Sequence, residues 1–172
     1  MIEVANPWYA ITLIGAPELW ALFAALLFTI YIGMKIINRG RRDRKTKSRL
    51  NDLLILLVPA LVITFLAVMV LKGFFAVPRQ CVPCIVELVG CNPYCPLDAS
   101  FPSGHAATAF AGFTALWLFA GARKEWLAVY LIPLLVAASR IMLGVHTWLD
   151  AFAGAVIGIL IAFAVMELDK KI

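Results

Sequence analysis

Charged residues are scarce in this sequence. Asp, Glu, Lys and Arg make up 15% of its 172 residues, hydrophobic residues make up 63%, and the mean hydropathy is +0.94. A water-soluble domain of this size does not need so large an apolar fraction. The composition therefore excludes an ordinary soluble protein. It predicts an all-α, polytopic transmembrane helix bundle that forms a single domain over residues 1–172.

Other features are missing as well. Met1–Pro17 lacks a basic start and carries Glu3 and Pro7, so a cleavable signal peptide is not expected. The acidic residues form no carboxylate cluster of the kind that holds Mg²⁺, and no internal repeat is visible. The net charge of +5 is concentrated, because eight of the fifteen Lys and Arg lie between Lys35 and Arg49. This distribution argues against a nucleic-acid-binding surface.

Apolar stretches of spanning length are what the sequence does contain. A membrane-crossing helix needs about 20 apolar residues. The segment 1–17 is broken by Asn6-Pro7 and carries Trp8 and Tyr9, which predicts an interfacial segment. Five spans are expected after it: Leu19–Ile37, Leu53–Leu71, Gly104–Gly121, Trp126–Leu143 and His146–Met166.

Basic residues predict the orientation of these spans. The cluster between Lys35 and Arg49 is expected on the cytoplasmic side of the cell membrane. Alternation then places 122–125 and the Lys170-Lys171 tail on that side, and both contain basic residues. The loop 73–103 is expected on the extracytoplasmic side, together with all of the unusual polar residues near the span ends. These are Lys72, Arg79, Ser103, His105, Arg140, His146 and Asp150.

The most informative polar cluster is Arg140, His146 and Asp150, because charges are costly in apolar sequence. His146 and Asp150 are four residues apart, which places them on one face of a helix. A carboxylate behind a histidine fixes its tautomer, so His146 is a candidate nucleophile or base. The structural alternative is a buried ion pair between Arg140 and Asp150.

Two further segments fall on the same side. Lys72 alone is explained by an interfacial lysine whose stem is buried, and Arg79 alone by an ordinary loop charge. Pro102 and Ser103 precede an apolar run and predict a helix start that Ser103 caps. A helix amino terminus with Gly104 also forms an anion site, and His105 could protonate a leaving oxygen.

Three motifs occur in order along the chain: Lys72-x6-Arg79, Pro102-Ser103-Gly104-His105 and Ser139-Arg140-x5-His146-x3-Asp150. Together they resemble the three-part signature of the type 2 phosphatidic acid phosphatase superfamily, which also contains vanadium haloperoxidases. The first motif differs from the family pattern, because Gln80 stands where the family usually has proline and Pro78 comes before the arginine instead.

The resemblance implies a role for each residue. His146 attacks phosphorus and forms a phosphohistidine, while Asp150 orients its ring. His105 acts first as general acid and then as general base. The phosphate is held by cations and helix-start groups, so neither a metal nor another cofactor is expected. These phosphate-binding residues are Lys72, Arg79, Ser103, Gly104 and Arg140.

All four cysteines lie in the loop 73–103. Their spacing, Cys81-x2-Cys84-x6-Cys91-x3-Cys95, is compatible with a zinc site. An extracytoplasmic location favours two disulfides instead. Four cysteines allow three pairings, and the sequence does not choose among them.

The expected function is hydrolysis of a lipid phosphate or diphosphate at the extracytoplasmic face, with a polyprenyl diphosphate as the preferred substrate. Phosphatidylglycerophosphate, phosphatidic acid and lipid A phosphates are alternatives. Two other classes are a vanadate-dependent haloperoxidase and a non-catalytic lipid-binding or transport protein. The expected partners are the lipid substrate and membrane lipids, whereas the oligomeric state is not predicted.

Overall fold

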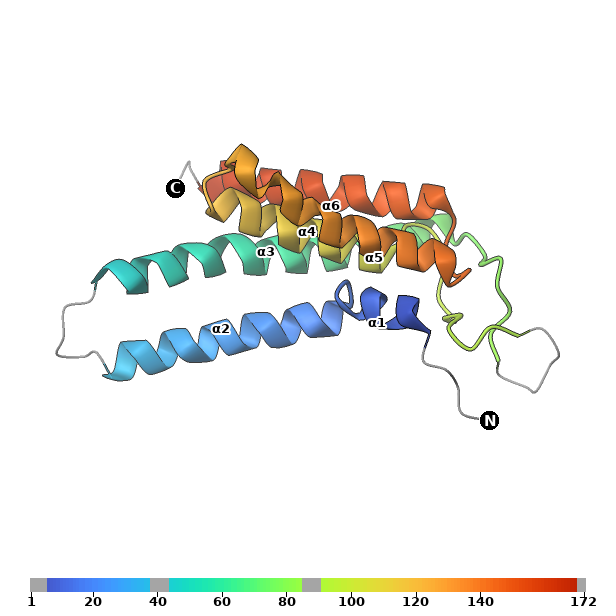
Figure 1. The fold of residues 1–172 in the computed structure, drawn as a ribbon, viewed down its shortest axis with the longest axis horizontal. Helices are drawn as coiled ribbons and strands as arrows, with labels where there is room; N and C mark the ends of the chain where they lie inside the picture. The colour runs from blue at the N-terminus through green and yellow to red at the C-terminus, as the bar shows by residue number, and fades with distance from the viewer. Residues whose placement is uncertain (1–5, 38–43, 85–90, 170–172) are drawn as a thin grey trace.

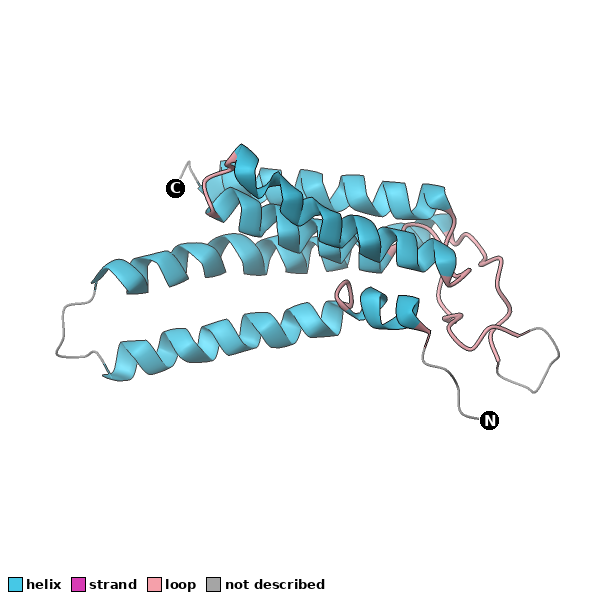
Figure 2. Cartoon of the chain, in the orientation of Figure 1, coloured by secondary structure: helices cyan, strands magenta, loops and turns pink. Residues whose placement is uncertain are grey.

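The computed structural model describes residues 6–37, 44–84 and 91–169. Figure 2 shows these residues as helices joined by loops, so the predicted all-α class is confirmed. The β-structure found within these ranges is one isolated β-bridge, between Pro83 and Asn92. The elements are α1 (Pro7–Leu13), α2 (Pro17–Ile37), α3 (Arg44–Phe75), α4 (Gly104–Phe119), η1 (Lys124–Tyr130), α5 (Leu131–Met142) and α6 (Trp148–Asp169).

The helices are those of a multi-pass membrane protein. Within the described ranges, four helical stretches are long and apolar enough to cross a membrane: Pro17–Ile36, Arg49–Phe75, Lys124–Met142 and Trp148–Asp169. They correspond to four of the five predicted spans. The remaining one, predicted at 104–121, is helix α4, which has 16 residues. At 1.5 Å per residue α4 is about 24 Å long, shorter than the ~30 Å hydrocarbon core, so five spans are not shown.

Helix α4 forms the centre of the bundle and contacts α3, α5 and α6 (Figure 1). Most of its residues are buried, among them Ala107 and Ala111. Gly154 and Gly158 of α6 face it, and a Cβ on Gly158 would collide with the carbonyl oxygen of Ala107. Small residues on both helices therefore allow their backbones to approach closely, as is common between membrane helices.

The two ends of the bundle differ. At one end lie helix α1, the loop after α3 and the turn between α5 and α6 (Figure 1). At the other end lie the last turn of α2, the first turn of α3 and the last turn of α6. Part of the predicted cytoplasmic basic cluster (residues 38–43) and Lys170-Lys171 lie outside the described residues. The predicted site residues thus share one end of the molecule, whichever side of a membrane that end faces.

Candidate active site

A polar cavity of about 260 Å³ lies at the loop end of the bundle. Six of the predicted site residues line it: Lys72, Arg79, Gly104, His105, Arg140 and His146. Ser103 and Asp150 do not line the cavity, because they are buried beside it at 0% and 4% exposure. Three elements distant in sequence therefore meet at one cavity, which contains three cations and two histidines.

Lys72 lies in the last turn of α3 and is buried, with 9% of its surface exposed. Its Nζ lies 2.8 Å from Oδ2 of Asp98 and also donates a hydrogen bond to the carbonyl oxygen of Ala99. The ammonium group is thus directed into the cavity. The interfacial alternative for Lys72 does not describe this arrangement, because that reading requires an exposed ammonium group.

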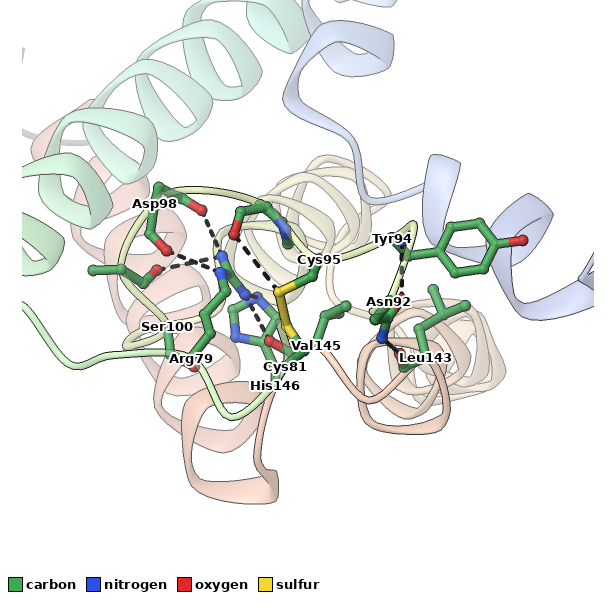
Figure 3. Close-up of a disulfide and its surroundings, with 12 residues drawn as sticks. Arg79, Cys81, Asn92, Tyr94, Cys95, Asp98, Ser100, Leu143, Val145 and His146 are labelled. Carbon is green, nitrogen blue, oxygen red and sulfur yellow. Dashed lines mark hydrogen bonds and ion pairs between the residues drawn. A yellow bond between two sulfur atoms is a disulfide. The ribbon is translucent and has the colours of Figure 1, made fainter. Parts of the chain in front are cut away.

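Arg79 extends from the loop after α3 into the same cavity, with a side chain that is 5% exposed. Its Nη2 donates to Oδ1 of Asp98 at 2.6 Å, and its Nε donates to the carbonyl oxygen of Asp98 at 2.9 Å. Its Nη1 donates to the carbonyl oxygen of Val145 at 2.6 Å and lies 3.2 Å from Nε2 of His146 (Figure 3). The guanidinium group therefore bridges Asp98 and the predicted nucleophile.

Asp98 was not among the predicted site residues. Its carboxylate contacts both Lys72 and Arg79, and these hydrogen bonds hold its pKa below the ordinary value although burial acts in the opposite direction. Asp98 is therefore ionised and occupies part of the surface that two cations present to the cavity. The sequence gives little indication of this role, since an acidic residue four positions before Pro102 does not reveal which basic residue it pairs with.

His146 lies in the turn between α5 and α6. The α6 helix begins at Trp148, so the expectation that the helix starts near His146 is wrong by two residues. Gly144 has φ of +68°, a left-handed conformation that glycine adopts without steric cost. The backbone N–H groups of Val145 and His146 both donate to the carbonyl oxygen of Arg140. This turn places the imidazole in the cavity.

Asp150 stands behind His146, but the contact between them is loose. Nδ1 of His146 lies 3.4 Å from Oδ2 of Asp150 and makes no hydrogen bond within the part of the chain that the structure describes. That oxygen accepts hydrogen bonds from Oγ of Ser100 at 2.6 Å and from the backbone N–H of Thr147 at 2.8 Å. The N–H of Asp150 in turn donates to Oγ1 of Thr147 at 3.2 Å, which completes a reciprocal cap at the start of α6. Asp150 thus fixes a helix terminus as well as facing the imidazole.

The surroundings of His146 favour a neutral ring. Burial, followed by the positive charges of Arg79 and Arg140, lowers the pKa of His146 well below its ordinary value. The Nη1 group of Arg79 can only donate, so Nε2 of His146 is the acceptor and the ring proton lies on Nδ1, toward Asp150. In this tautomer the lone pair on Nε2 faces the cavity side of the ring.

Arg140 does not pair with Asp150, so the structural alternative of a buried ion pair between them is wrong. In the described part of the chain, its Nη1 donates to Oγ1 of Thr12 at 3.0 Å, while its Nε is buried without a partner. Thr12 lies in α1 and is 1% exposed. No feature of the sequence pointed to Thr12, because it is one hydroxyl in an apolar segment.

The α4 amino terminus brings Gly104 and His105 to the cavity. Ser103 occupies the N-cap position with extended backbone, as predicted, but its side chain makes no capping hydrogen bond. Its Oγ is buried and meets no hydrogen-bond partner in residues 6–37, 44–84 and 91–169, and its N–H donates to the carbonyl oxygen of Asp150 at 3.0 Å. The backbone of Ser103 therefore joins α4 to α6, which fixes His105 relative to the turn that carries His146.

The cysteines form two disulfides, Cys81–Cys95 and Cys84–Cys91, and none is free. The zinc alternative is therefore wrong. Cys81 is two residues from Arg79 and Cys95 is three residues from Asp98, so one disulfide joins the two segments that carry this ion pair (Figure 3). Beside Cys91, Asn92 donates to the carbonyl oxygen of Leu143 at 2.8 Å and ties the loop to the α5–α6 turn.

The sequence profile described as PAP2 superfamily matches residues 53–172. A solved structure, the transmembrane PAP2 type phosphatidylglycerolphosphate phosphatase from Bacillus subtilis, is similar over 98% of this chain and 80% of its own, with a TM-score of 0.62 and 27% identity. Aquifex aeolicus LpxE is similar over 97% of this chain and 99% of its own, with a TM-score of 0.51 and 29% identity.

Curated relatives match over shorter regions. A probable lipid phosphate phosphatase 4 of Arabidopsis thaliana is 38% identical over 79 residues, and an undecaprenyl-diphosphatase of Sulfolobus acidocaldarius is 35% identical over 75 residues. A lipid A 1-phosphatase of Porphyromonas gingivalis is 42% identical over 64 residues. These regions cover 37%, 44% and 36% of this chain and only 25%, 36% and 14% of the relatives' own lengths.

Proposed function

The chain belongs to the PAP2 superfamily, and from that premise we propose that it is an integral-membrane phosphatase that hydrolyses a lipid phosphate or lipid diphosphate. One observation carries the proposal. A cavity lined by three cations, Lys72, Arg79 and Arg140, also contains two histidines, His105 and His146. Cations in this number suit a phosphate dianion, and a paired histidine nucleophile and acid suit phosphoryl transfer.

The neighbouring cavity supports a lipid rather than a soluble substrate. An apolar groove of about 400 Å³ runs between α2 and α3 and reaches Thr108 of α4. Pro17, Glu18, Phe65 and Thr108 line both this groove and the polar cavity, so the two are adjacent. A lipid phosphate would place its head group among the cations and its first tail carbons against apolar side chains of the groove such as Val62, Phe65 and Leu66.

In the proposed reaction, the lone pair on Nε2 of His146 attacks phosphorus while the bond from phosphorus to the leaving oxygen breaks. His105 gives its proton to that oxygen, and an anion bound among the cations favours the protonated form of His105 that this step needs. Water then attacks the phosphohistidine as His105 takes a proton from it. The P–N bond breaks, inorganic phosphate leaves, and both histidines return to their starting states.

The three cations would stabilise the charge that the equatorial phosphate oxygens carry in the transition state. Arg79 must turn from Nε2 of His146 toward these oxygens before attack, since a lone pair that accepts a hydrogen bond is not free to react. The N–H groups at the start of α4, beside Gly104, would supply further donors. We expect this arrangement to work without a metal or other cofactor.

The preferred substrate is a polyprenyl diphosphate cleaved on the extracytoplasmic face. In this proposal α4 also crosses the membrane, which brings the number of spans to five. The whole chain is then one membrane-embedded domain, and residues 35–49 are cytoplasmic. The undecaprenyl-diphosphatase among the similar proteins supports this choice. Similarity to the phosphatidylglycerolphosphate phosphatase and to the lipid A 1-phosphatase supports two alternative substrates, phosphatidylglycerophosphate and lipid A phosphates, by the same kind of argument. Phosphatidic acid is a third alternative substrate.

Phosphate release from a panel of lipid phosphates in detergent tests the proposal. The wild-type protein and His146→Ala would each be assayed with and without EDTA. We expect release by the wild type, insensitivity to EDTA and near-complete loss in the variant. Absence of phosphate release by the wild type would favour the non-catalytic class, and release by His146→Ala would overturn the role of His146 as nucleophile. Loss of activity with EDTA would overturn the metal-free mechanism, and halide oxidation with added vanadate would favour the haloperoxidase class.

A further inference from the structure

The amino-terminal helix α1 reaches the site from outside the three motifs. Thr12, near its end, is 1% exposed, and its hydroxyl accepts a hydrogen bond from Nη1 of Arg140 at 3.0 Å. Arg140 is itself 5% exposed and lines the polar cavity. An uncompensated guanidinium in such a place is costly, and within the described ranges the Nε of Arg140 is buried without a hydrogen-bond partner. The position of this cation therefore depends on α1.

Several contacts hold α1 in place. The backbone at Gly15 lies against the site, since a Cβ there would come within 2.7 Å of the carbonyl oxygen of His105. The indole of Trp20 donates to the carbonyl oxygen of Ile14 at 2.8 Å, which joins α1 to α2. The ring of Tyr9 contacts that of Tyr94 in the disulfide-bonded loop, with centroids 5.1 Å apart and the rings tilted by 32°. Helix α1 thus packs between the end of the bundle that carries the polar cavity and the disulfide-bonded loop.

We propose that Thr12 is a positioning residue for phosphate binding: its hydroxyl orients the Arg140 guanidinium so that the remaining N–H groups face the phosphate. The proposal rests on the phosphatase function proposed above. It gives the amino-terminal segment a role in the site, beyond contact with the membrane surface. Removal of the hydroxyl leaves the guanidinium free to adopt other rotamers, which weakens its bond to the phosphate.

The test uses Thr12→Val, which keeps the shape of the side chain, and Thr12→Ser, which keeps the hydroxyl. Thr64→Val is the matched control, because Thr64 is also fully buried and its hydroxyl has no partner among the described residues. The measured quantity is the inhibition constant of inorganic phosphate against lipid-phosphate hydrolysis, with kcat/KM alongside. We expect Thr12→Val to raise the inhibition constant and to lower kcat/KM, each on the order of tenfold, as for loss of a hydrogen bond to a charged group. Thr12→Ser and Thr64→Val are expected to stay within about twofold.

A double-mutant cycle separates positioning from a general structural role. Direct binding of inorganic phosphate, measured by calorimetry, would be compared for Arg140→Ala and for Thr12→Val/Arg140→Ala. We expect no further loss in the double variant, because the residue that Thr12 orients is gone. An equal loss in both backgrounds, or an unchanged Thr12→Val, would overturn the inference. Absence of hydrolysis by the wild type would instead refute the phosphatase proposal, while phosphate binding would still report on Thr12.

Discussion

Nη1 of Arg79 lies 3.2 Å from Nε2 of His146, so a cation covers the nitrogen proposed to attack phosphorus. The same guanidinium group binds the carboxylate of Asp98 through Nη2 at 2.6 Å. Asp98 contacts Lys72 as well, and its two oxygens therefore lie on the two cations proposed to hold a phosphate. The carboxylate and the guanidinium group therefore satisfy each other's charge, and in the proposed reaction a phosphate would compete with Asp98 for Arg79.

Replacement of Asp98 by asparagine is expected to strengthen phosphate binding, because the amide carries no negative charge to compete for Lys72 and Arg79. We expect the inhibition constant of inorganic phosphate to fall on the order of tenfold, and KM with it. Glu125→Gln is the control, since it makes the same chemical change on an exposed residue of η1. If Asp98 served mainly to align Arg79, the inhibition constant would rise instead.

The lowered pKa of His146 can be measured by NMR, since the chain has only two histidines and His105→Gln assigns their signals. A depressed pKa means that the ring stays neutral as the pH falls below the ordinary value of 6.5. We expect no titration of His146 between about pH 6 and 8. Removal of a neighbouring cation in Arg79→Gln should raise the pKa of His146. A wild-type signal that titrates near 6.5 would contradict the neutral-nucleophile assignment.

The Cys81–Cys95 disulfide is expected to matter for phosphate binding as well as for stability, because it joins the Arg79 and Asp98 segments. Cys81→Ser/Cys95→Ser should lose about 3 kcal/mol of unfolding free energy, as for a closed loop of this length. It should also raise KM in the temperature range where the variant is folded. Cys84→Ser/Cys91→Ser is the matched control, since that disulfide is farther along the chain from Arg79. Equal KM values for the two double variants would argue against a role in positioning Arg79.

The close approach of α4 and α6 predicts a strong position effect for glycine replacement. Gly158→Ala is expected to destabilise the protein by about 1–3 kcal/mol, because its Cβ would collide with the Ala107 carbonyl. Gly33→Ala, on α2, has open space around the new Cβ and should be neutral or slightly stabilising. Thermal unfolding in detergent compares the two. Similar shifts for both variants would mean that α4 and α6 are not held at this distance.

The sequence alone determined the helical class, four of the expected spans and the identity of the cations and histidines in the cavity. It could do so because apolar runs and short motifs are local patterns, readable from neighbouring residues. Within one motif, the turn geometry still differed from expectation. The helix that contains Asp150 starts at Trp148, because Thr147 and Asp150 cap it, and His146 is left in the preceding turn.

The tertiary structure alone decided which groups satisfy these charges. Asp98 pairs with Lys72 and Arg79. Thr12 accepts a hydrogen bond from Arg140, and Ser100 donates one to the carboxylate of Asp150. Each of the last two pairs joins residues 50 or more positions apart, so no local pattern marks them. A buried charge needs a partner wherever the fold can supply one, and that choice depends on how the helices pack. The cysteine pairing was fixed in the same way, by the path of the loop between α3 and α4.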